Sequence, residues 1–396
     1  MRIVIAGAGI GGLVVAQALV RAGDDVVVVE RDPGVAATGG YRLHLDADAC
    51  VVLREHLPPT GWERLLAGSA RAAAVPRLMV RDHRLRLLAT ARPVPDEEWL
   101  LVDRRLLRRV LVDGVEDRIC WSRTVEGFGE SAAGVVARTT GGDLEADVMI
   151  GADGARSVVS EQLLGRPAAR DLGYSAVAGR VPLALADGLA DLVTESGVLA
   201  FGVDGTGVFL SRSVRTETAA VAGGVATEDA DLVWSAIAAT GRISTDPERL
   251  TGLLRRWDPR VRRLPGLSDP ATIARFPFLA ADPGQELMPW PANRVTALGD
   301  AVHAMPPTGG QGAATAVRDA GLLAGALESV RRGRVTVPVA LADYQRAMTA
   351  YAPAAVAESL QPVRWMRMLE RPAARVIGRV AFPVAAAVRS VGVVAR

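Results

Sequence analysis

The hydrophobic pattern at the start of the chain predicts a strand, a helix and a second strand. The β-branched run of residues 2–6 leads into a glycine-rich turn, and apolar positions then recur at helical spacing over residues 13–22. Gly23 suits the position after the helix, and residues 26–30 form a second apolar run. This is the pattern of a βαβ unit, from which doubly wound parallel sheets are built.

A second transition of this kind lies at residues 296–317, which indicate a strand end, a tight turn and the start of a helix at about Ala313. Gly299 permits the turn, and Asp300 places a carboxylate at the carboxyl end of the strand, where open α/β sheets bind ligands. The helix N-terminus offers N–H donors to an anion. The alternative is a connector that only lets strand and helix pack.

Residues 171–275 show a different pattern, with β-branched runs broken by glycines. It predicts an antiparallel sheet, followed by helices at residues 229–240 and 247–256. Residues 76–90 alternate apolar and basic positions and predict a hairpin that belongs to the same second domain. The predicted strands are residues 181–185, 200–212 and 218–225.

Residues 46–57 predict a helix that begins at an Asp N-cap and ends before two prolines. Residues 103–111 have an apolar stripe at helical spacing, which leaves four arginines on the opposite, normally solvent-exposed face. These arginines are Arg104, Arg105, Arg108 and Arg109.

Residues 337–351 predict a helix, and residues 359–396 alternate apolar groups with arginines. A helix on a membrane surface is one interpretation of this tail. A helix packed back on the protein, or a dimer contact, is favoured, and we expect a monomer or a homodimer. The chain has no 18-residue apolar run free of charge, so no transmembrane segment is expected.

The charge balance argues against a nucleic-acid-binding protein, because 46 basic and 44 acidic residues leave a net charge of only +2. Cys50 and Cys120 lie far apart, which suits a reducing cytoplasm. The four histidines show no metal-ligand spacing and no pairing with a Ser or Cys motif, so no metal is expected.

The first turn carries the clearest chemical signal. Gly7, Gly9 and Gly12 form a GxGxxG motif between strand and helix, and Glu30 follows at the end of the second strand. The glycines allow a tight turn and close approach of a pyrophosphate, while Glu30 can accept hydrogen bonds from a ribose. An acidic residue here favours FAD or NAD, and the alternative is a Rossmann scaffold without a nucleotide.

Together with residues 151–157 and 299–312, this motif resembles the single-component FAD-dependent monooxygenases, the family of aromatic and polyketide hydroxylases. The resemblance implies that Asp300 holds the ribityl chain and that the helix start at Gly312 and Ala313 faces the pyrimidine edge of the flavin. It also implies that Arg104 reaches FAD and that Asp153 and Gly154 stand near both FAD and a nicotinamide nucleotide. Many members carry an arginine where this chain has Ser160.

Other residues are candidates by their position. Arg31 follows Glu30 and is included among the cofactor-binding residues, and Arg42 could neutralise a phosphate of the flavin or of the nicotinamide nucleotide, unless it is a solvated surface arginine. Pro307 lacks an N–H donor and, with Pro306, could border a small apolar space over the flavin. Pro307, Gly310 and Arg42 are the candidates for a catalytic role.

The expected fold is α/β, with a Rossmann-type FAD-binding domain, a smaller antiparallel-sheet substrate domain and C-terminal helices. We predict that residues 1–75, 95–170 and 276–355 bind FAD, that residues 76–94 and 171–275 bind the substrate, and that residues 356–396 form a C-terminal helical segment.

The resemblance implies hydroxylation of an electron-rich aromatic or polyketide-like small molecule by NAD(P)H, O2 and a C4a-hydroperoxyflavin. One alternative is Baeyer–Villiger oxidation, epoxidation or antibiotic inactivation by the same fold. Another is a flavin-binding protein without turnover.

Overall fold

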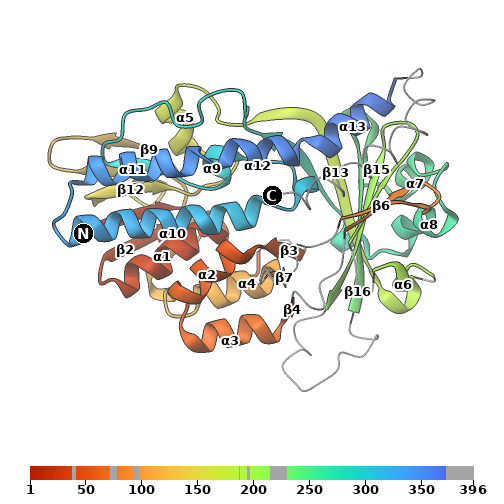
Figure 1. Cartoon of the computed structure of the whole chain (residues 1–396), viewed down its shortest axis with the longest axis horizontal. Coiled ribbons are helices and arrows are strands. Elements are labelled where there is room, and N and C mark those ends of the chain that lie inside the picture. The colour runs from red at the N-terminus through yellow and green to blue at the C-terminus, as the bar shows by residue number, and fades with distance from the viewer. Residues whose placement is uncertain are drawn as a thin grey trace, which may run out of the picture. The chain divides into compact units, whose positions relative to one another are not determined.

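The computed structural model describes residues 1–37, 42–71, 78–91, 99–186, 188–193, 197–214 and 230–371. The chain divides into two compact units, each with a main sheet of its own (Figure 1). The first unit contains Met1–Ser69, Glu98–Arg170 and Leu279–Leu360. The second contains Ala70–Glu97, Asp171–Phe278 and Gln361–Arg396.

The first unit is built on a five-stranded sheet in the order β18-β12-β1-β2-β8, in which all neighbours are parallel. The predicted βαβ unit is confirmed, with α1 (Ile10–Arg21) between its strands. These strands are β1 (Arg2–Ala6), β2 (Asp25–Val29), β8 (Ile119–Cys120), β12 (Val148–Gly151) and β18 (Val295–Ala297).

One face of the parallel sheet is covered by helices, among which the long α10 (Gly312–Arg331) packs on α1, α2 and α11 (Figure 1). The predicted helix over residues 46–57 is confirmed as α2 (Ala47–His56), whose N-cap Asp46 accepts a hydrogen bond from the Ala49 N–H at 2.9 Å. The other helices of this unit are α3 (Pro59–Ala67), α4 (Arg104–Val112), α5 (Val158–Leu164), α9 (Asp300–His303), α11 (Val337–Thr349) and α12 (Ala352–Ser359).

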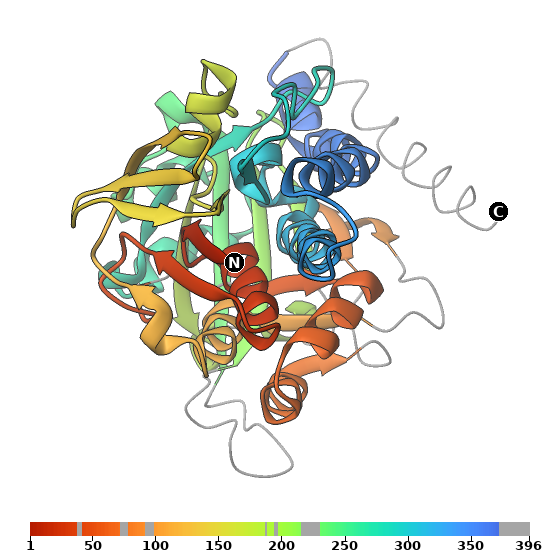
Figure 2. The same cartoon turned by 90° about the vertical axis from the view of Figure 1, so that its left-hand side faces the viewer.

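Two small sheets complete the first unit. An antiparallel sheet of β9 (Val125–Glu130), β10 (Val135–Thr139) and β11 (Leu144–Ala146), drawn in yellow in Figure 2, shares a hydrophobic cluster with β1 and β12. The other sheet has the order β3-β7-β4. Its strands are β3 (Arg42–Leu45), β7 (Leu100–Asp103) and β4 (Ser69–Arg71).

The second unit is a seven-stranded sheet in the order β17-β13-β16-β15-β14-β5-β6. The predicted hairpin is confirmed by β5 (Leu78–Asp82) and β6 (Leu87–Ala91), which pair antiparallel. One face packs on α7 and α8 and the other on α13. The remaining elements are β13 (Arg170–Pro182), β14 (Val198–Phe201), β15 (Gly207–Val214), β16 (Ala230–Ala239), β17 (Ala274–Ala280), α6 (Ala190–Val193), α7 (Pro247–Leu253), α8 (Pro259–Leu267) and α13 (Gln361–Leu369).

The helix predicted over residues 229–240 is wrong, because this segment is the strand β16. It pairs with β13 on one side and β15 on the other, and nearly all its side chains are buried. A strand buried on both faces lacks the alternation that separates strand from helix in a sequence. Within this strand, Asp231 Oδ2 lies 3.7 Å from Arg180 Nη1 of the neighbouring strand β13.

The strand predicted at residues 218–225 lies outside the described residues, as do residues 372–396 of the basic tail. Within the tail, α13 buries Val363, Met366 and Leu369 against the sheet of the second unit, in agreement with a helix packed on the protein. Across the described part of the chain, no helix has the length and apolar character needed to cross a membrane.

Candidate cofactor site

The three predicted turns lie on neighbouring strands of the parallel sheet. The glycine-rich turn follows β1, the Asp153–Gly154 turn follows β12, and the Gly299–Asp300 turn follows β18. Because the carboxyl ends of parallel strands meet at one edge, the structure brings these turns together where α/β sheets bind ligands.

The glycines of the first turn have separable roles. A Cβ on Gly7, whose φ is 104°, would lie 2.4 Å from the carbonyl oxygen of Ala152, and one on Gly12 would lie 2.1 Å from that of Gly7. A Cβ on Gly9 would come no closer than 3.9 Å to the described protein atoms. Internal packing therefore explains Gly7 and Gly12 but not Gly9, which leaves room beside the start of α1 for a pyrophosphate.

Glu30 is buried at the end of β2 and braces this turn. Its Oε2 accepts a hydrogen bond from the Ala8 N–H at 2.7 Å, and its Oε1 accepts one from the Asp32 N–H at 2.8 Å. Each carboxylate oxygen can accept a further hydrogen bond, so Glu30 can still receive one from a ribose hydroxyl.

The prediction of a solvated arginine face on α4 is wrong for Arg108, which is 4% exposed. Its Nε donates to the Ala8 carbonyl at 3.0 Å and its Nη1 to Asp32 at 3.1 Å. The apolar stripe assigned Arg108 to the outer face, but α4 packs against α1 and turns this residue toward the glycine-rich turn. Arg105 and Arg109 are exposed, as predicted.

The other predicted arginines lie at different depths. Arg31 is exposed after β2, whereas Arg42 and Arg104 are partly buried. Arg42 is opposite Asp103 in the β3–β7 pair, so it lies near the start of α4, where Arg104 is the first residue. Gly39, Gly40 and Tyr41 lie outside the described residues.

The side chain of Asp153 holds the start of α5. Its Oδ1 accepts a hydrogen bond from the Ser157 hydroxyl at 2.5 Å, and its Oδ2 accepts one from the Val158 N–H at 2.8 Å. Burial raises the pKa of Asp153, and these hydrogen bonds oppose that effect. Gly154 has a φ of 83°, which favours glycine, and a Cβ there would meet nothing within 4 Å. The Asp153 carboxylate therefore shapes the turn and leaves the backbone open.

Asp300 is the first residue of α9 and lies beside the start of α10. A Cβ on Gly312 would be 3.8 Å from Asp300 Oδ1. Desolvation by the surrounding protein raises the pKa of Asp300, the charges of His303 and Arg104 oppose this rise, and the charge of Asp319 adds to it. The residue is exposed, so a ligand can reach its carboxylate.

The first N–H groups of α10, on Gly312 and Ala313, have no partner inside the helix. The preceding turn runs from Pro307 to Gly309, and Pro307 and Gly310 are both exposed. Gly310 has a φ of 69°, which favours glycine. The site thus combines a carboxylate at Asp300, the N–H groups at the start of α10 and an open space at Gly9. This combination suits a ligand with a phosphate end and a polar ring, such as FAD.

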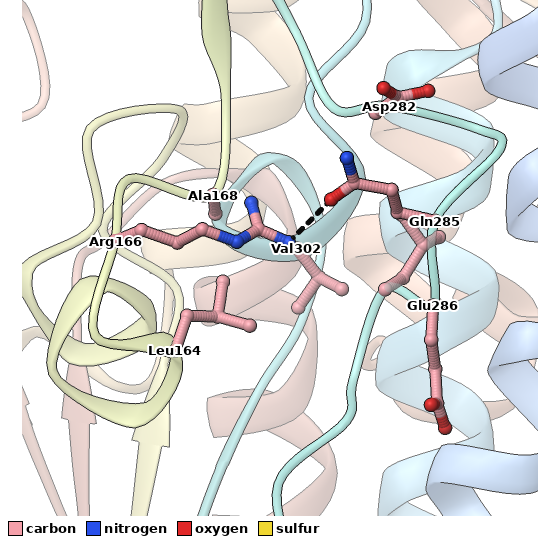
Figure 3. Close-up of a pocket in the computed structure, with 8 residues that line it drawn as sticks. Leu164, Arg166, Ala168, Asp282, Gln285, Glu286 and Val302 are labelled. Carbon is pink, nitrogen blue, oxygen red and sulfur yellow. Dashed lines mark hydrogen bonds between the residues drawn. The ribbon is translucent and has the colours of Figure 1, made fainter.

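A small pocket elsewhere in the first unit is shown in Figure 3. Its volume of about 10 Å³ holds roughly one water molecule, and Arg166 donates to Gln285 across it at 2.7 Å. It is too small for a cofactor and contains none of the predicted site residues. Its lining residues are Leu164, Arg166, Ala168, Asp282, Gln285, Glu286, Leu287 and Val302. No cluster of three or more metal-ligating side chains occurs in the described ranges.

Among curated relatives, the dual O-methyltransferase/FAD-dependent monooxygenase elcB of Phaeosphaeria nodorum is 30% identical over 375 residues, covering 80% of this chain and 39% of its own. The aurachin C monooxygenase/isomerase of Stigmatella aurantiaca is 28% identical, covering 87% of this chain and 84% of its own. The chain thus spans about two fifths of the length of the fungal relative.

Among solved structures, a protein from Photorhabdus luminescens subsp. laumondii assigned as an FAD-containing monooxygenase matches with a TM-score of 0.75 and 30% identity, covering 92% of this chain and 98% of the other. The sequence model of a family described as FAD binding domain matches residues 1–177 and 279–359, which hold all three turns of the candidate site. The chain therefore belongs to this FAD-binding family, that of the FAD-dependent monooxygenases predicted from its motifs.

Proposed function

We propose that this protein is an FAD-dependent monooxygenase that uses NAD(P)H and O2 to hydroxylate an electron-rich aromatic or polyketide-like small molecule. The observation that carries the proposal is the convergence of the three turns at one edge of the parallel sheet. Family membership supports it. The bound flavin would supply the redox chemistry, and the protein would bind, orient and shield it.

Each residue of the site has a proposed role in holding FAD. Gly7, Gly9 and Gly12 would form the pyrophosphate-binding turn, with Glu30 accepting from a ribose and Arg31 and Arg104 placed to neutralise negative charge. Asp300 would accept hydrogen bonds from the ribityl chain. The N–H groups of Gly312 and Ala313 would face the electron-accepting edge of the ring, where they can stabilise negative charge.

The remaining candidates are proposed to act at the ring and at the nicotinamide nucleotide. Pro307 and Gly310 present an exposed surface that donates no side-chain hydrogen bond and can exclude water around the reacting atoms. Arg42 is proposed to bind a phosphate of FAD or of NAD(P)H. The backbone of Asp153 and Gly154 would lie beside both nucleotides.

We assign substrate binding to the second unit, since the nucleotide motifs all lie in the first. The hydrophobic cluster between this sheet and α13 is rich in aromatic side chains. Tyr174, Phe201 and Phe278 are buried in it, whereas Phe209 and Phe276 of the sheet and Trp365 of α13 are partly buried, and we assign contacts with an aromatic substrate to these three. The name of one relative, aurachin C monooxygenase/isomerase, supports a small-molecule substrate.

Steady-state NAD(P)H oxidation tests the function. The purified protein should carry non-covalent FAD and oxidise NAD(P)H faster when a true substrate is present. A flavin-binding protein without turnover would bind FAD and show no NAD(P)H oxidation with any candidate. Product structures would separate hydroxylation from epoxidation, Baeyer–Villiger oxidation and antibiotic inactivation. A cytoplasmic location and a monomeric or homodimeric state remain predictions, the first supported by two free cysteines.

A further inference from the structure

Asp319 is a fully buried carboxylate on α10 that joins two other segments, the turn at α9 and the start of α12. Its Oδ2 accepts a hydrogen bond from the Gly299 N–H at 2.8 Å and lies 2.6 Å from His303 Nε2. Its Oδ1 accepts a hydrogen bond from the Tyr351 hydroxyl. Asp319 therefore has both oxygens engaged inside the first unit.

Two of these partners flank the residue that we assign to the flavin. Gly299 is the N-cap of α9 and His303 its last residue, and Asp300 lies between them at the first helical position. A four-residue helix has little stability of its own. One oxygen of Asp319 thus bonds both ends of the turn that carries Asp300.

The partner histidine is fully buried. Burial acts to lower the pKa of His303, but the charge and hydrogen bond of Asp319, and then the charge of Asp300, raise it above its usual value. Its Nδ1 has no hydrogen-bond partner in the described structure. In return, the charge of His303 lowers the pKa of Asp300.

Several other charged or titratable groups face this pair. The charge of Arg104 lowers the pKa of Asp300, and that of Asp319 raises it. Tyr351 and Tyr344 face Asp319, and burial followed by the charge of Asp319 raises the pKa of each. The elements α5 and α12 also pack against α9. They bring Glu161, which is exposed, and Glu358, which accepts a hydrogen bond from Gln311 at 2.6 Å.

We propose that Asp319 and His303 are positioning residues for the cofactor site: Asp319 fixes the turn that bears Asp300, and His303, at the other end of the same short helix, supplies the positive charge that supports binding of FAD by the Asp300 carboxylate. This rests on the proposed function, because Asp300 is assigned there to the ribityl chain. Neither residue was identified from the sequence, although Asp319 is a carboxylate on the buried face of α10 among Ala316, Ala320 and Leu323.

The test is the dissociation constant of FAD, measured by flavin fluorescence on apoprotein from about pH 5 to about pH 9. His303→Gln keeps a donor toward Asp319 and removes the charge. FAD binding should weaken as the pH falls and Asp300 becomes protonated. If His303 keeps Asp300 ionised, this loss of affinity begins at a higher pH in His303→Gln than in wild type. At an acidic pH where wild type still binds, the dissociation constant should rise about tenfold, as for a lost charge-assisted hydrogen bond. At alkaline pH, where Asp300 is ionised in both proteins, the constants should converge.

Asp319→Asn should bind FAD more weakly at every pH, because the turn that bears Asp300 loses the hydrogen bonds that fix both its ends. His56→Gln, on α2, is the matched control and should follow wild type. Asp300→Asn should bind FAD weakly, and its affinity should not fall further at acidic pH. Wild-type affinity for FAD in this variant would refute the assignment of Asp300 to FAD. If Asp300→Asn weakens FAD binding but the dissociation constant of His303→Gln equals that of wild type at every pH, only the positioning proposal fails. Unfolding of both His303→Gln and Asp319→Asn, seen by circular dichroism, would also overturn it, since the pair would then serve the fold.

Discussion

The guanidinium of Arg108 lies against the carboxylate of Glu30, with Nη2 3.6 Å from Oε2. The two residues come from α4 and the end of β2, and both are buried. Because Glu30 accepts from the Ala8 N–H while Arg108 donates to the Ala8 carbonyl, the pair holds the two successive peptide groups on either side of the Ala8 Cα in the glycine-rich turn. The geometry of the proposed pyrophosphate site thus depends on a residue outside the GxGxxG motif.

Replacing Arg108 with Met should therefore destabilise the apoprotein and weaken FAD binding. The change leaves the buried Glu30 without its cation, and removing one partner of a buried ion pair costs about 3–5 kcal/mol. Arg109→Met, on the same helix but exposed, is the matched control and should behave as wild type. Urea unfolding of the apoproteins and FAD titration measure the two effects. Equal stability of the two variants would contradict a structural role for the Arg108–Glu30 pair.

Alanine at two glycines of the turn should separate folding from cofactor binding. Gly12→Ala puts a Cβ 2.1 Å from the backbone oxygen of Gly7, so the helix must shift, and overpacking of this kind costs about 1–3 kcal/mol. Gly9→Ala meets no atom closer than 3.9 Å and should melt like wild-type apoprotein. Its dissociation constant for FAD should nevertheless rise at least about tenfold, which corresponds to a loss of about 1.4 kcal/mol of binding free energy. Wild-type FAD affinity in Gly9→Ala would show that the pyrophosphate does not lie there.

The parts of this structure that the sequence predicted depend on local signals. The N-cap at Asp46, the glycine after α1 and the alternation of the β5–β6 hairpin are each encoded within a few residues. The turn at Asp300 was found for the same reason, whereas the turn at Asp153 was assigned through the resemblance to the family. The parallel sheet brings both turns to one edge.

What the sequence did not predict depends on partners far along the chain. β16 is buried between two strands, so its apolar run carries no period. The position of Arg108 follows from how α4 packs on α1, and the partners of Asp319 lie at positions 299, 303 and 351. In such cases the sequence shows only that a charged residue occupies a helix position that faces the core. Which residue pairs with it is known only from the three-dimensional structure.

Substrate choice is expected to lie in residues 171–275, which contain no nucleotide motif. Exchanging them for the corresponding segment of a relative should change the accepted substrate and leave FAD binding intact. Flavin content and a substrate panel followed by NAD(P)H consumption measure the two properties. Loss of FAD in parallel with loss of activity would mean that the division of roles between the two units is wrong.

The source of the product oxygen decides whether the protein is a monooxygenase. The N–H groups of Gly312 and Ala313 lie beside the Asp300 carboxylate, where they can stabilise negative charge that accumulates on a reduced ring. Pro307 has no backbone N–H and so cannot hold a water molecule by donating a hydrogen bond. Its surface would therefore help to exclude water from the reacting atoms. We therefore expect turnover under isotopically labelled dioxygen to place one labelled atom in the product, with NAD(P)H consumption matching product formation.

Mass spectrometry of the product provides the measurement, and turnover in labelled water under ordinary dioxygen is its control. Label acquired from water would contradict the monooxygenase assignment. Release of hydrogen peroxide alone in the presence of the true substrate would indicate an oxidase, because the bound substrate would then fail to receive oxygen. In either case the FAD site described here would stand, since its binding residues are tested separately by the Gly9→Ala and Asp300→Asn variants.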